Sequence, residues 1–473
     1  MTNVAHTSTS RPSSAAQAAF TALSACNARF LDFAGRNPAG LERRSFAALA
    51  QKNDLVPYPL QPWPTFVTTR LIEEAGRMNN ALVELIKSLP RRLFGNDPVK
   101  IADFYRVDPA YAAPLIVLLK DDLYMRGLLA RGDYVNTAAG FQCLEINVGG
   151  NLGGWKAPIW ARLYAHVPLF ERFIREEGIA YVHRSPVQLF FRHTLEQARA
   201  TGLLDGRIDY AFVVPAGRRS GPEVQAVANH ELRRALQKHA PGVSGEVVVC
   251  DASELRLGPG DRLTWRGRRI HAVVEHTFGR CDRSVLQSLQ AGQVNVYDGP
   301  VTELLEDKRN LALLSEHETS DLFDAAEREV IARHVPWTRV VHPGTTRYQG
   351  ETVRLPDLLL ARQEDLILKP AKAAKGEGVQ IGRLLSPEVW RRGVETALAT
   401  PDSWLVQAYV ESLPYPYQHG EHGCADHDMV WGFFAFGPLY GGGFLRMMPK
   451  AGSRGVINAA QGATEGVLME VEQ

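Results

Sequence analysis

The chain has 473 residues, with 45% hydrophobic and 22% charged side chains and a formal net charge of +1 at pH 7. Its length exceeds that of one ordinary domain and predicts two or three compact units of common globular composition. The balanced charge gives no electrostatic reason to expect nucleic acid or an anionic membrane as the main partner.

Three further features favour a cytoplasmic protein. The five cysteines are scattered without a CxxC pair, which favours reduced thiols over a disulfide framework. No run of about 18 apolar residues is present, so no helix is expected to span a membrane. Residues 1–16 are rich in Ser, Thr and Ala and lack the apolar core of a secretory signal, so we expect a mobile lead-in.

The first part of the chain is predicted to be mainly helical. Between residues 17 and 130, apolar residues recur at helical spacing, most clearly in 69–89 and 114–129. A strand–turn–strand pattern follows, in which residues 131–135 lead through Asn and Gly residues into 141–147. This pattern is typical of a β-hairpin.

Residues 185–300 alternate between strand and helix patterns. Strand patterns lie at 210–215, 245–250 and 271–275, and helical patterns at 222–239 and 282–291. The alternation predicts a small parallel α/β unit. No glycine fingerprint stands at a strand–helix turn, so a dinucleotide site has little support in this unit.

Residues 301–473 show a different pattern. The expected helices are 307–315, 319–334 and 387–399, and the expected strands are 365–370, 379–382, 404–410, 429–436 and 441–448. Long strands that follow one another directly are typical of antiparallel pairing. We therefore expect an α+β arrangement in this part.

Four polar residues of the expected hairpin could share one face. Residues two apart on a strand point to the same side, so Arg131 lies with Asp133, and Glu145 with Asn147. Two carboxylates and an amide oxygen are hard ligands that suit magnesium, and an arginine suits a phosphate that gains charge during transfer. An ordinary hairpin with a polar, solvent-facing side explains the same residues equally well.

Lysines and glycines indicate a phosphate-binding region in the C-terminal part. Lys369 interrupts an apolar strand, where its charge is costly unless an anion is near. Lys375, Gly376 and Gly378 follow in a flexible segment whose backbone N–H groups could approach phosphate oxygens. Lys308, in a helical segment, could join them. For Lys369 the alternative is a side chain that extends to solvent from a strand end. For residues 375–378 it is a surface loop, and for Lys308 an exposed helix residue.

Two weaker patterns complete the candidate residues. The end of the strand 404–410 could offer backbone groups to an adenine ring and a carboxylate to ribose hydroxyls. Its residues are Gln407, Tyr409, Val410 and Glu411. Arg446 and Asn458 stand near glycines and could bind a phosphate or a carboxylate. A polar strand end or an ordinary surface loop explains each pattern when it is taken alone.

Potential metal ligands cluster in residues 418–428. They are His419, His422, Cys424, Asp426, His427 and Asp428. Their spacing matches no standard zinc motif, so we expect a solvated loop rather than a structural zinc site. Asp428, directly before a strand, could instead line a nucleotide-binding lobe.

Together these motifs resemble the ATP-grasp superfamily. In D-alanine–D-alanine ligases and bacterial glutathione synthetases, two lysines hold the ATP phosphates, and Lys308 and Lys369 stand in matching sequence. The glycine-rich loop of the family resembles residues 374–378. Its adenine-hinge strand resembles residues 405–411.

The C-terminal residues and the order of the motifs extend the resemblance. Arg446, Asn458 and Gly462 resemble the Arg–Asn–Gly pattern of glutathione synthetases, although Ala463 replaces a second glycine of that pattern. In those enzymes the magnesium strands, R-x-D followed by E-x-N, come last. Here they precede the end of the chain by about 300 residues, which resembles glutathionylspermidine synthetases and circularly permuted ATP-grasp families. Termini that lie close together at a surface make such a permutation tolerable.

The resemblance covers most of residues 125–165 and 265–473 and has consequences for the fold. It implies an α+β fold with a circularly permuted ATP-grasp catalytic domain, an additional small α/β domain and a helical N-terminal segment. The implied units are a lead-in over 1–16, a helical region with the magnesium strands over 17–184, the small α/β domain over 185–300 and the ATP-binding lobes over 301–473.

The same resemblance implies an activity. ATP and Mg²⁺ would activate a carboxylate as an acyl phosphate, and an amine would displace phosphate to form an amide. Asp133, Glu145 and Asn147 would hold magnesium. Lys308, Lys369, the glycine-rich loop and the hinge strand would bind ATP. Arg131, Arg446 and Asn458 would bind the reacting groups. The substrates would be a small-molecule or peptide carboxylate and an amine, without nucleic acid or membrane, in a protein that could form a homo-oligomer. A phosphotransferase and a non-catalytic nucleotide-binding protein remain alternatives.

Overall fold

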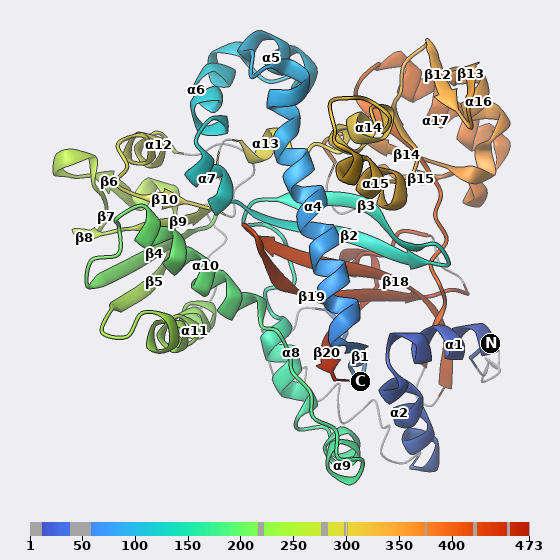
Figure 1. The fold of residues 1–473 in the computed structure, drawn as a ribbon, viewed down its shortest axis with the longest axis horizontal. Coiled ribbons are helices and arrows are strands. Elements are labelled where there is room, and N and C mark those ends of the chain that lie inside the picture. Colours follow the sequence, from blue (N-terminus) through green and yellow to red (C-terminus); the bar gives the residue numbers. More distant parts are fainter. Residues whose placement is uncertain are drawn as a thin grey trace, which may run out of the picture.

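A seven-stranded sheet occupies the centre of the structure (Figure 1). The structure is a computed structural model that describes residues 12–37, 58–215, 222–275, 282–297, 299, 301–373, 376–419, 423–451 and 455–472. From edge to edge the strands of the sheet are β1 (Thr65–Thr68), β20 (Thr464–Val471), β19 (Leu439–Pro449), β18 (Gly423–Phe436), β2 (Leu129–Thr137) and β3 (Gly140–Val148), and β17 (Tyr415–His419) pairs with β18. The pair β1–β20 is parallel, and the other pairs are antiparallel. Three adjacent strands from the end of the chain, β20, β19 and β18, therefore lie between β1 and the hairpin β2–β3 from its first third.

The long helix α4 (Thr69–Phe94) crosses this sheet (Figure 1). The side chain of Thr68 caps its first turn by accepting from the N–H of Leu71, and Gly95, at a φ of +60°, ends it. The hydroxyl of Tyr134 on β2 donates to Oδ1 of Asn79 on α4 at 2.9 Å. A Cβ at Gly132 would collide with Asn79, so the helix can approach β2 this closely only above a glycine.

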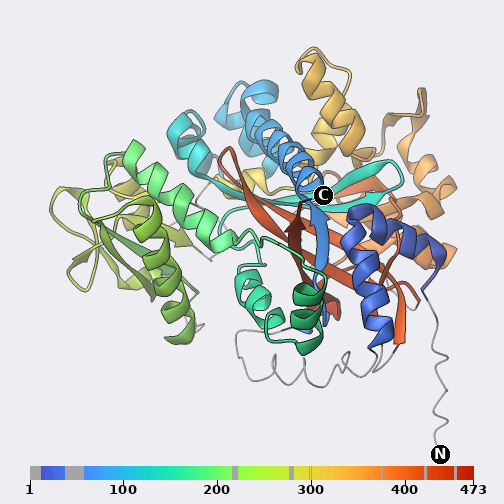
Figure 2. The ribbon, with the colours of Figure 1, turned by 60° about the horizontal axis from the view of Figure 1, so that its bottom comes forward.

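The N-terminal helices α1 (Ser14–Leu23) and α2 (Ala25–Arg36) lie beside the central sheet, on the side away from the small parallel unit (Figures 1 and 2). The expected lead-in over residues 1–16 is therefore too long, because Ser13 caps α1 by accepting from the N–H of Ala16. Phe20 is buried, and its ring meets that of Tyr417 edge-on at 5.4 Å. This apolar contact packs the first helix against β17.

The mainly helical prediction for residues 17–130 is confirmed in outline and corrected in detail. The further helices of this half are α5 (Pro98–Tyr105), α6 (Pro109–Leu119), α7 (Asp122–Gly127), α8 (Ala157–Tyr164) and α9 (Pro168–Glu176). The expected helix 114–129 is two helices, because the side chain of Asp121 caps a new helix start, and Leu129 already belongs to β2. The short strand β1 was not expected, since only its pairing with β20 makes four residues a strand.

The three strands expected between residues 185 and 300 pair in parallel, with helices between them. The sheet of this unit has the order β10 (Asn295–Val296), β9 (Ala272–Glu275), β4 (Arg207–Val213) and β5 (Ser244–Cys250), with parallel pairing throughout. Its helices are α10 (Pro186–Ala200), α11 (Pro222–His239) and α12 (Arg283–Gln290). A three-stranded insertion of β6 (Leu255–Leu257), β7 (Leu263–Trp265) and β8 (Arg268–Arg269) was not expected.

Three of the five strands expected in residues 301–473 lie in a C-terminal lobe as β14 (Leu366–Pro370), β15 (Gln380–Ile381) and β16 (Trp404–Ala408), whereas the expected strands 429–436 and 441–448 belong to β18 and β19 of the central sheet. The sheet of this lobe has the order β11 (Thr338–Val340), β16, β14 and β15, and β12 (Thr345–Tyr348) pairs with β13 (Glu351–Arg354). Its helices are α13 (Thr302–Leu305), α14 (Arg309–Glu316), α15 (Ala325–His334), α16 (Leu355–Ala361) and α17 (Pro387–Ala399). The expected helix 319–334 is too long, because Asp324 and Glu327 form a capping box that starts α15 at Ala325.

No helix in the described ranges is both long enough and apolar enough to cross a lipid bilayer. The longest, α4, carries charged residues along its length, including Glu73, Glu74 and Arg77. Its buried residues instead face the central sheet.

A buried ion pair ties the lobe to the helical region. Arg309, 1% exposed, donates to Oδ1 and Oδ2 of Asp307 at 3.0 and 2.7 Å. It also donates to the backbone oxygens of Phe104 at 2.7 Å and Asp402 at 3.0 Å. Asp307 precedes Lys308 directly, so this network also fixes the start of α14.

We expect Asp307→Ala to lower the free energy of unfolding by about 3–5 kcal/mol, because it leaves the buried charge of Arg309 unpaired. Urea denaturation monitored by circular dichroism measures this change. The control is Asp321→Ala, whose fully exposed carboxylate lies 3.8 Å from Arg328 and should change stability by less than about 0.5 kcal/mol. Equal stabilities of the two variants would show that the pair has no structural role.

Candidate functional site

The expected hairpin is formed by β2 and β3, and its four polar residues lie opposite one another. Arg131 pairs with Asn147, and Asp133 with Glu145. Arg131 donates through Nε to Oδ1 and through Nη2 to Oδ2 of Asp133, each at 2.8 Å. Arg446 on β19 reaches the same carboxylate, with Nη2 2.8 Å from Oδ2. Two arginines from distant parts of the sequence therefore meet at one buried carboxylate.

Asp133 remains ionised between these arginines. Its side chain is 3% exposed, and those of Arg131 and Arg446 are 8% and 9% exposed. Burial by itself would raise the pKa of Asp133, but the two guanidinium groups outweigh burial and hold this pKa well below its usual range. The charged carboxylate thus fixes the position of both guanidinium groups.

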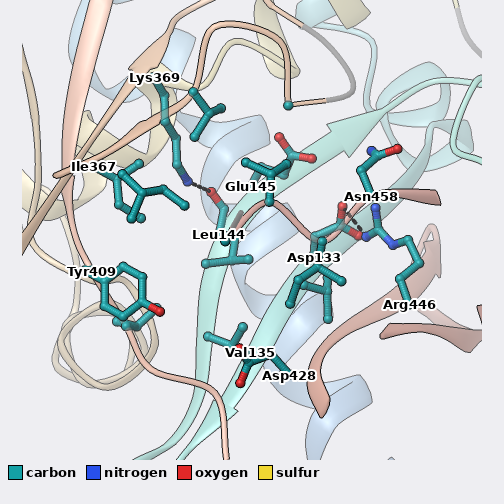
Figure 3. A pocket seen from close by; sticks show the side chains of 18 of the residues that line it. Asp133, Val135, Leu144, Glu145, Ile367, Lys369, Tyr409, Asp428, Arg446 and Asn458 are labelled. Atoms are coloured by element: carbon teal, nitrogen blue, oxygen red, sulfur yellow. Dashed lines mark hydrogen bonds and ion pairs between the residues drawn. The ribbon is translucent and has the colours of Figure 1, made fainter. Parts of the chain in front are cut away.

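Two lysines from the C-terminal lobe reach the same hairpin. Nζ of Lys308 lies 3.4 Å from Oε2 of Glu145. Nζ of Lys369 on β14 donates to the backbone oxygen of Leu144 at 3.2 Å and to Oε1 of Gln407 at 2.6 Å. Figure 3 shows Lys369 extending towards the hairpin that carries Glu145 and Asp133.

Lys369 is a buried cation held by neutral oxygens. It is 8% exposed, and burial lowers its pKa to about 8, although the charge of Glu145 opposes this effect. Its two hydrogen-bond acceptors, a backbone oxygen and an amide oxygen, carry no formal charge. An incoming anion would stabilise its protonated form, so its position suits a phosphate group.

Two adjoining cavities border these residues. The first, with a volume of about 130 Å³, has a largely apolar lining that includes Val135, Leu144, Ile367, Ile381, Val430 and Val456. The second has a volume of about 760 Å³ and many charged lining residues. The residues that line both are Glu145, Lys308, Ala373, Arg446 and Asn458. Charged groups therefore stand where the apolar cavity meets the polar one.

Most of the residues predicted from the sequence line one of these cavities. Asp133, Glu145, Lys308, Lys369, Gly376, Tyr409, Val410, Arg446 and Asn458 line the first, and Arg131 and Asn147 line the second. Gly376 has a φ of +74°, and a Cβ there would lie 2.5 Å from a methyl carbon of Val456. Only glycine can hold this loop so close to the cavity.

Gln407 was expected to contact the nucleotide, but it lines neither cavity. It is fully buried, and its amide accepts from Lys369 and donates to Oγ1 of Thr338 at 3.1 Å. Strands β16 and β14 pair antiparallel, with Gln407 opposite Ile367 and Lys369 opposite Leu405, so the two side chains lie on the same face within hydrogen-bonding reach. Gln407 therefore positions Lys369.

Two other predicted contacts also lie away from both cavities. The carboxylate of Glu411 forms an ion pair with Lys450 at 2.8 Å. Gly378, at a φ of +70°, supplies a turn that packs against Pro370. Lys375 lies outside the described residues, so its predicted contact stays a prediction.

The sequence reasoning missed an acidic side of the second cavity. Glu303, Glu306 and Glu465 contribute to its lining. Burial raises the pKa of Glu306 to about 7, and that of Glu465 to about 7 as well. No local pattern marks these residues, since Glu465 comes beside Arg446 only through the pairing of β19 with β20.

The described residues of the segment 418–428 belong to two paired strands, in place of the expected solvated loop. Strand β17 ends at His419 and β18 begins at Gly423, with His427 only 1% exposed. His422 lies outside the described residues. Within the described ranges, no group of three or more His, Cys, Asp and Glu side chains is arranged to hold a metal ion. Asp428 lines the first cavity.

Comparison with known proteins yields remote structural likenesses. No protein-family model and no curated protein matches the sequence. A solved structure from Methylobacillus flagellatus KT, provisionally named gamma-glutamylcysteine synthetase, aligns over 82% of this chain and 88% of its own, with 11% identity and a TM-score of 0.41. D-alanyl-alanine synthetase A from Vibrio cholerae O1 biovar eltor str. N16961 aligns over 48% and 67%, with 13% identity and a TM-score of 0.28. At these values the function must be inferred from the site itself.

Proposed function

We propose that this protein is an ATP-dependent ligase that joins a carboxylate to an amine through an acyl phosphate. The observation that carries the proposal is the meeting of the two cavities at Glu145, Lys308 and Arg446. An apolar slot on one side suits a flat base, and a larger polar space on the other suits the substrates. The charged groups between them occupy the place that a transferred phosphoryl group would need.

Each group of residues at the site has a separate role in the proposed reaction. Lys369 and Lys308 would neutralise the phosphates of ATP, and the apolar side chains of the first cavity would cover its base. Arg131 and Arg446, held by Asp133, would orient the substrate carboxylate and balance the charge that develops on transfer. Proximity and charge neutralisation account for this chemistry without a protein nucleophile.

The donor groups present fit a magnesium ion that is shared with ATP. Magnesium uses one or two carboxylates and completes its shell with water and substrate phosphates. Glu145 is 30% exposed and lines both cavities, and Asn147 lines the second. We assign the metal to these two residues, and assign Asp133 to the arginines, because both of its oxygens already accept from guanidinium groups. Bound magnesium would neutralise phosphate oxygens during transfer.

A circularly permuted ATP-grasp domain is the architecture that we propose for this site. Strand β2 pairs with β18, so the hairpin with Glu145 lies beside strands that follow it by nearly 300 residues. In an unpermuted ATP-grasp domain the magnesium strands come last in the sequence. Here they come early but lie beside the last strands, which agrees with a circular permutation. The proposed units remain 17–184, 185–300 and 301–473, and the proposed location remains the cytoplasm.

The direct test is a screen for ADP release with pairs of substrates. Amino acids and short peptides serve as carboxylates, and hydroxylamine, amino acids and aliphatic diamines serve as amines. The ligase proposal predicts ADP release that requires both partners, with a hydroxamate or an amide identified by mass spectrometry. A phosphorylated product that forms without any amine would select a phosphotransferase. Nucleotide binding without turnover for any pair would contradict catalysis.

A further inference from the structure

Glu465 is a buried carboxyl group of the second cavity that the proposed chemistry above leaves unused. It lies on β20 directly opposite Arg446 on β19. The residue is 5% exposed, and its Oε2 has no hydrogen-bond partner among the described residues. It lines the 760 Å³ cavity together with Arg131, Arg446 and Glu145. A buried oxygen without a partner indicates a ligand that supplies one.

The charged groups that face Glu465 come from three elements. Arg446 on β19, Arg131 on β2 and Lys156, directly before α8, all favour its ionised form. Burial has the larger effect and raises its pKa to about 7. None of these three cations forms an ion pair with Glu465 among the described residues, so the carboxyl group can exchange a proton near neutral pH.

The other carboxylates of the cavity are less suited to this exchange. Glu303 is paired with Lys372 at 3.2 Å, and Glu145 with Lys308 at 3.4 Å. Glu306 is half-buried, and its strongest favourable neighbour is Lys308 on the phosphate side of the cavity. Glu465 instead lies beside Arg446, where the substrate carboxylate is proposed to bind.

We propose that Glu465 is the base that accepts a proton from the incoming amine, so that the second cavity takes a substrate with a protonated amino group. This inference rests on the proposed ligase function. The ammonium group gives one proton to Glu465, and the free amine attacks the acyl carbon. The C–N bond forms, and the C–O bond to phosphate breaks with its electron pair on the leaving oxygen. The phosphate takes the second nitrogen proton, and Glu465 later returns the first to water.

The test compares two kinds of nucleophile in Glu465→Gln. Hydroxylamine is uncharged at neutral pH and needs no base, whereas amino acids and diamines arrive as ammonium ions. With the carboxylate found in the ADP screen, we expect amide formation from the panel amines at pH 7 to fall by about a hundredfold or more, because general-base catalysis contributes factors of this order. Hydroxamate formation should stay within about threefold of the unsubstituted protein, which also shows that the variant is folded.

At saturating ATP, a rise in pH should bring amide formation by the variant closer to that of the unsubstituted protein at the same pH, because the free amine then forms in solution. The matched control is Glu470→Gln on the same strand, which is equally buried at 5% exposure but is paired with Arg184 at 2.8 Å and lines neither cavity. It should leave both reactions unchanged. Full retention of amide formation in Glu465→Gln would overturn the proposal. A loss of hydroxamate formation equal to the loss of amide formation would also overturn it, because it would show that Glu465 only positions Arg446. If the unsubstituted protein gives neither ADP nor hydroxamate with any carboxylate, the ligase function itself fails, and the proposed base with it.

Discussion

Glu145→Gln is expected to reduce ADP formation by about 10²–10³-fold, because the substitution removes the negative charge that we assign to magnesium. Glu145 lines both cavities and is 30% exposed, so its side chain faces the site and contributes little to the core. The fold should therefore persist, with little change in the urea midpoint. The measurement is ADP release as a function of magnesium concentration, in which the variant should need more metal for half-maximal rate.

The control for this prediction is Glu177→Gln. Its carboxylate has similar exposure, 27%, and is paired with Arg29 at 2.7 Å on the periphery of the protein. This variant should retain the magnesium dependence of the unsubstituted protein. Near-normal turnover of Glu145→Gln at saturating magnesium would show that Glu145 is not a metal ligand.

Lys369→Ala is expected to weaken ATP binding by about 2–4 kcal/mol, which is about a 30- to 1,000-fold rise in Kd. The reason is the loss of a buried cation on β14 of the C-terminal lobe. Its Nζ reaches the hairpin β2–β3, where it lies 3.2 Å from the backbone oxygen of Leu144. Titration calorimetry with ATP and magnesium measures the change. Unfolding of the variant without a change in nucleotide affinity would make Lys369 a structural residue only.

The matched control is Lys87→Ala, since Lys87 is also 8% exposed but is paired with Glu84 at 2.8 Å on α4. It should leave ATP affinity unchanged.

The pH dependence provides a second measurement. Because burial lowers the pKa of Lys369 to about 8, the cation is present below that pH and is lost as the pH rises through it. ATP affinity should therefore decline above about pH 8, and Lys369→Ala should remove that decline.

The two cavities also explain why substrate identity is hard to derive from motifs. Residues proposed for ATP, such as Lys308 and Lys369, lie in short conspicuous patterns, because phosphate requires cations and glycines wherever it binds. Residues on the substrate side, such as Glu306 and Glu465, are ordinary glutamates in the sequence. Their chemistry depends on burial and on neighbours from other strands.

The sequence by itself determined the local features of this protein. The strand–turn–strand pattern predicted the hairpin with Arg131, Asp133, Glu145 and Asn147, and β2 and β3 form it. The parallel unit followed from alternating strand and helix patterns, and the antiparallel lobe from successive strands. Such features depend on contacts between near neighbours, so a single sequence contains the information needed to predict them.

Only the tertiary structure decided which distant residues act together. The short strand β1 exists because β20 supplies its hydrogen bonds. Asp133 was predicted as a metal ligand, but the approach of Arg446 across the sheet engages it with two guanidinium groups. Gln407 likewise became a partner of Lys369. The charge around Asp133 is set by a strand about 300 residues later in the sequence, and the hydrogen bonds of Gln407 by strands that do not adjoin β16 in the sequence, so local periodicity cannot predict them.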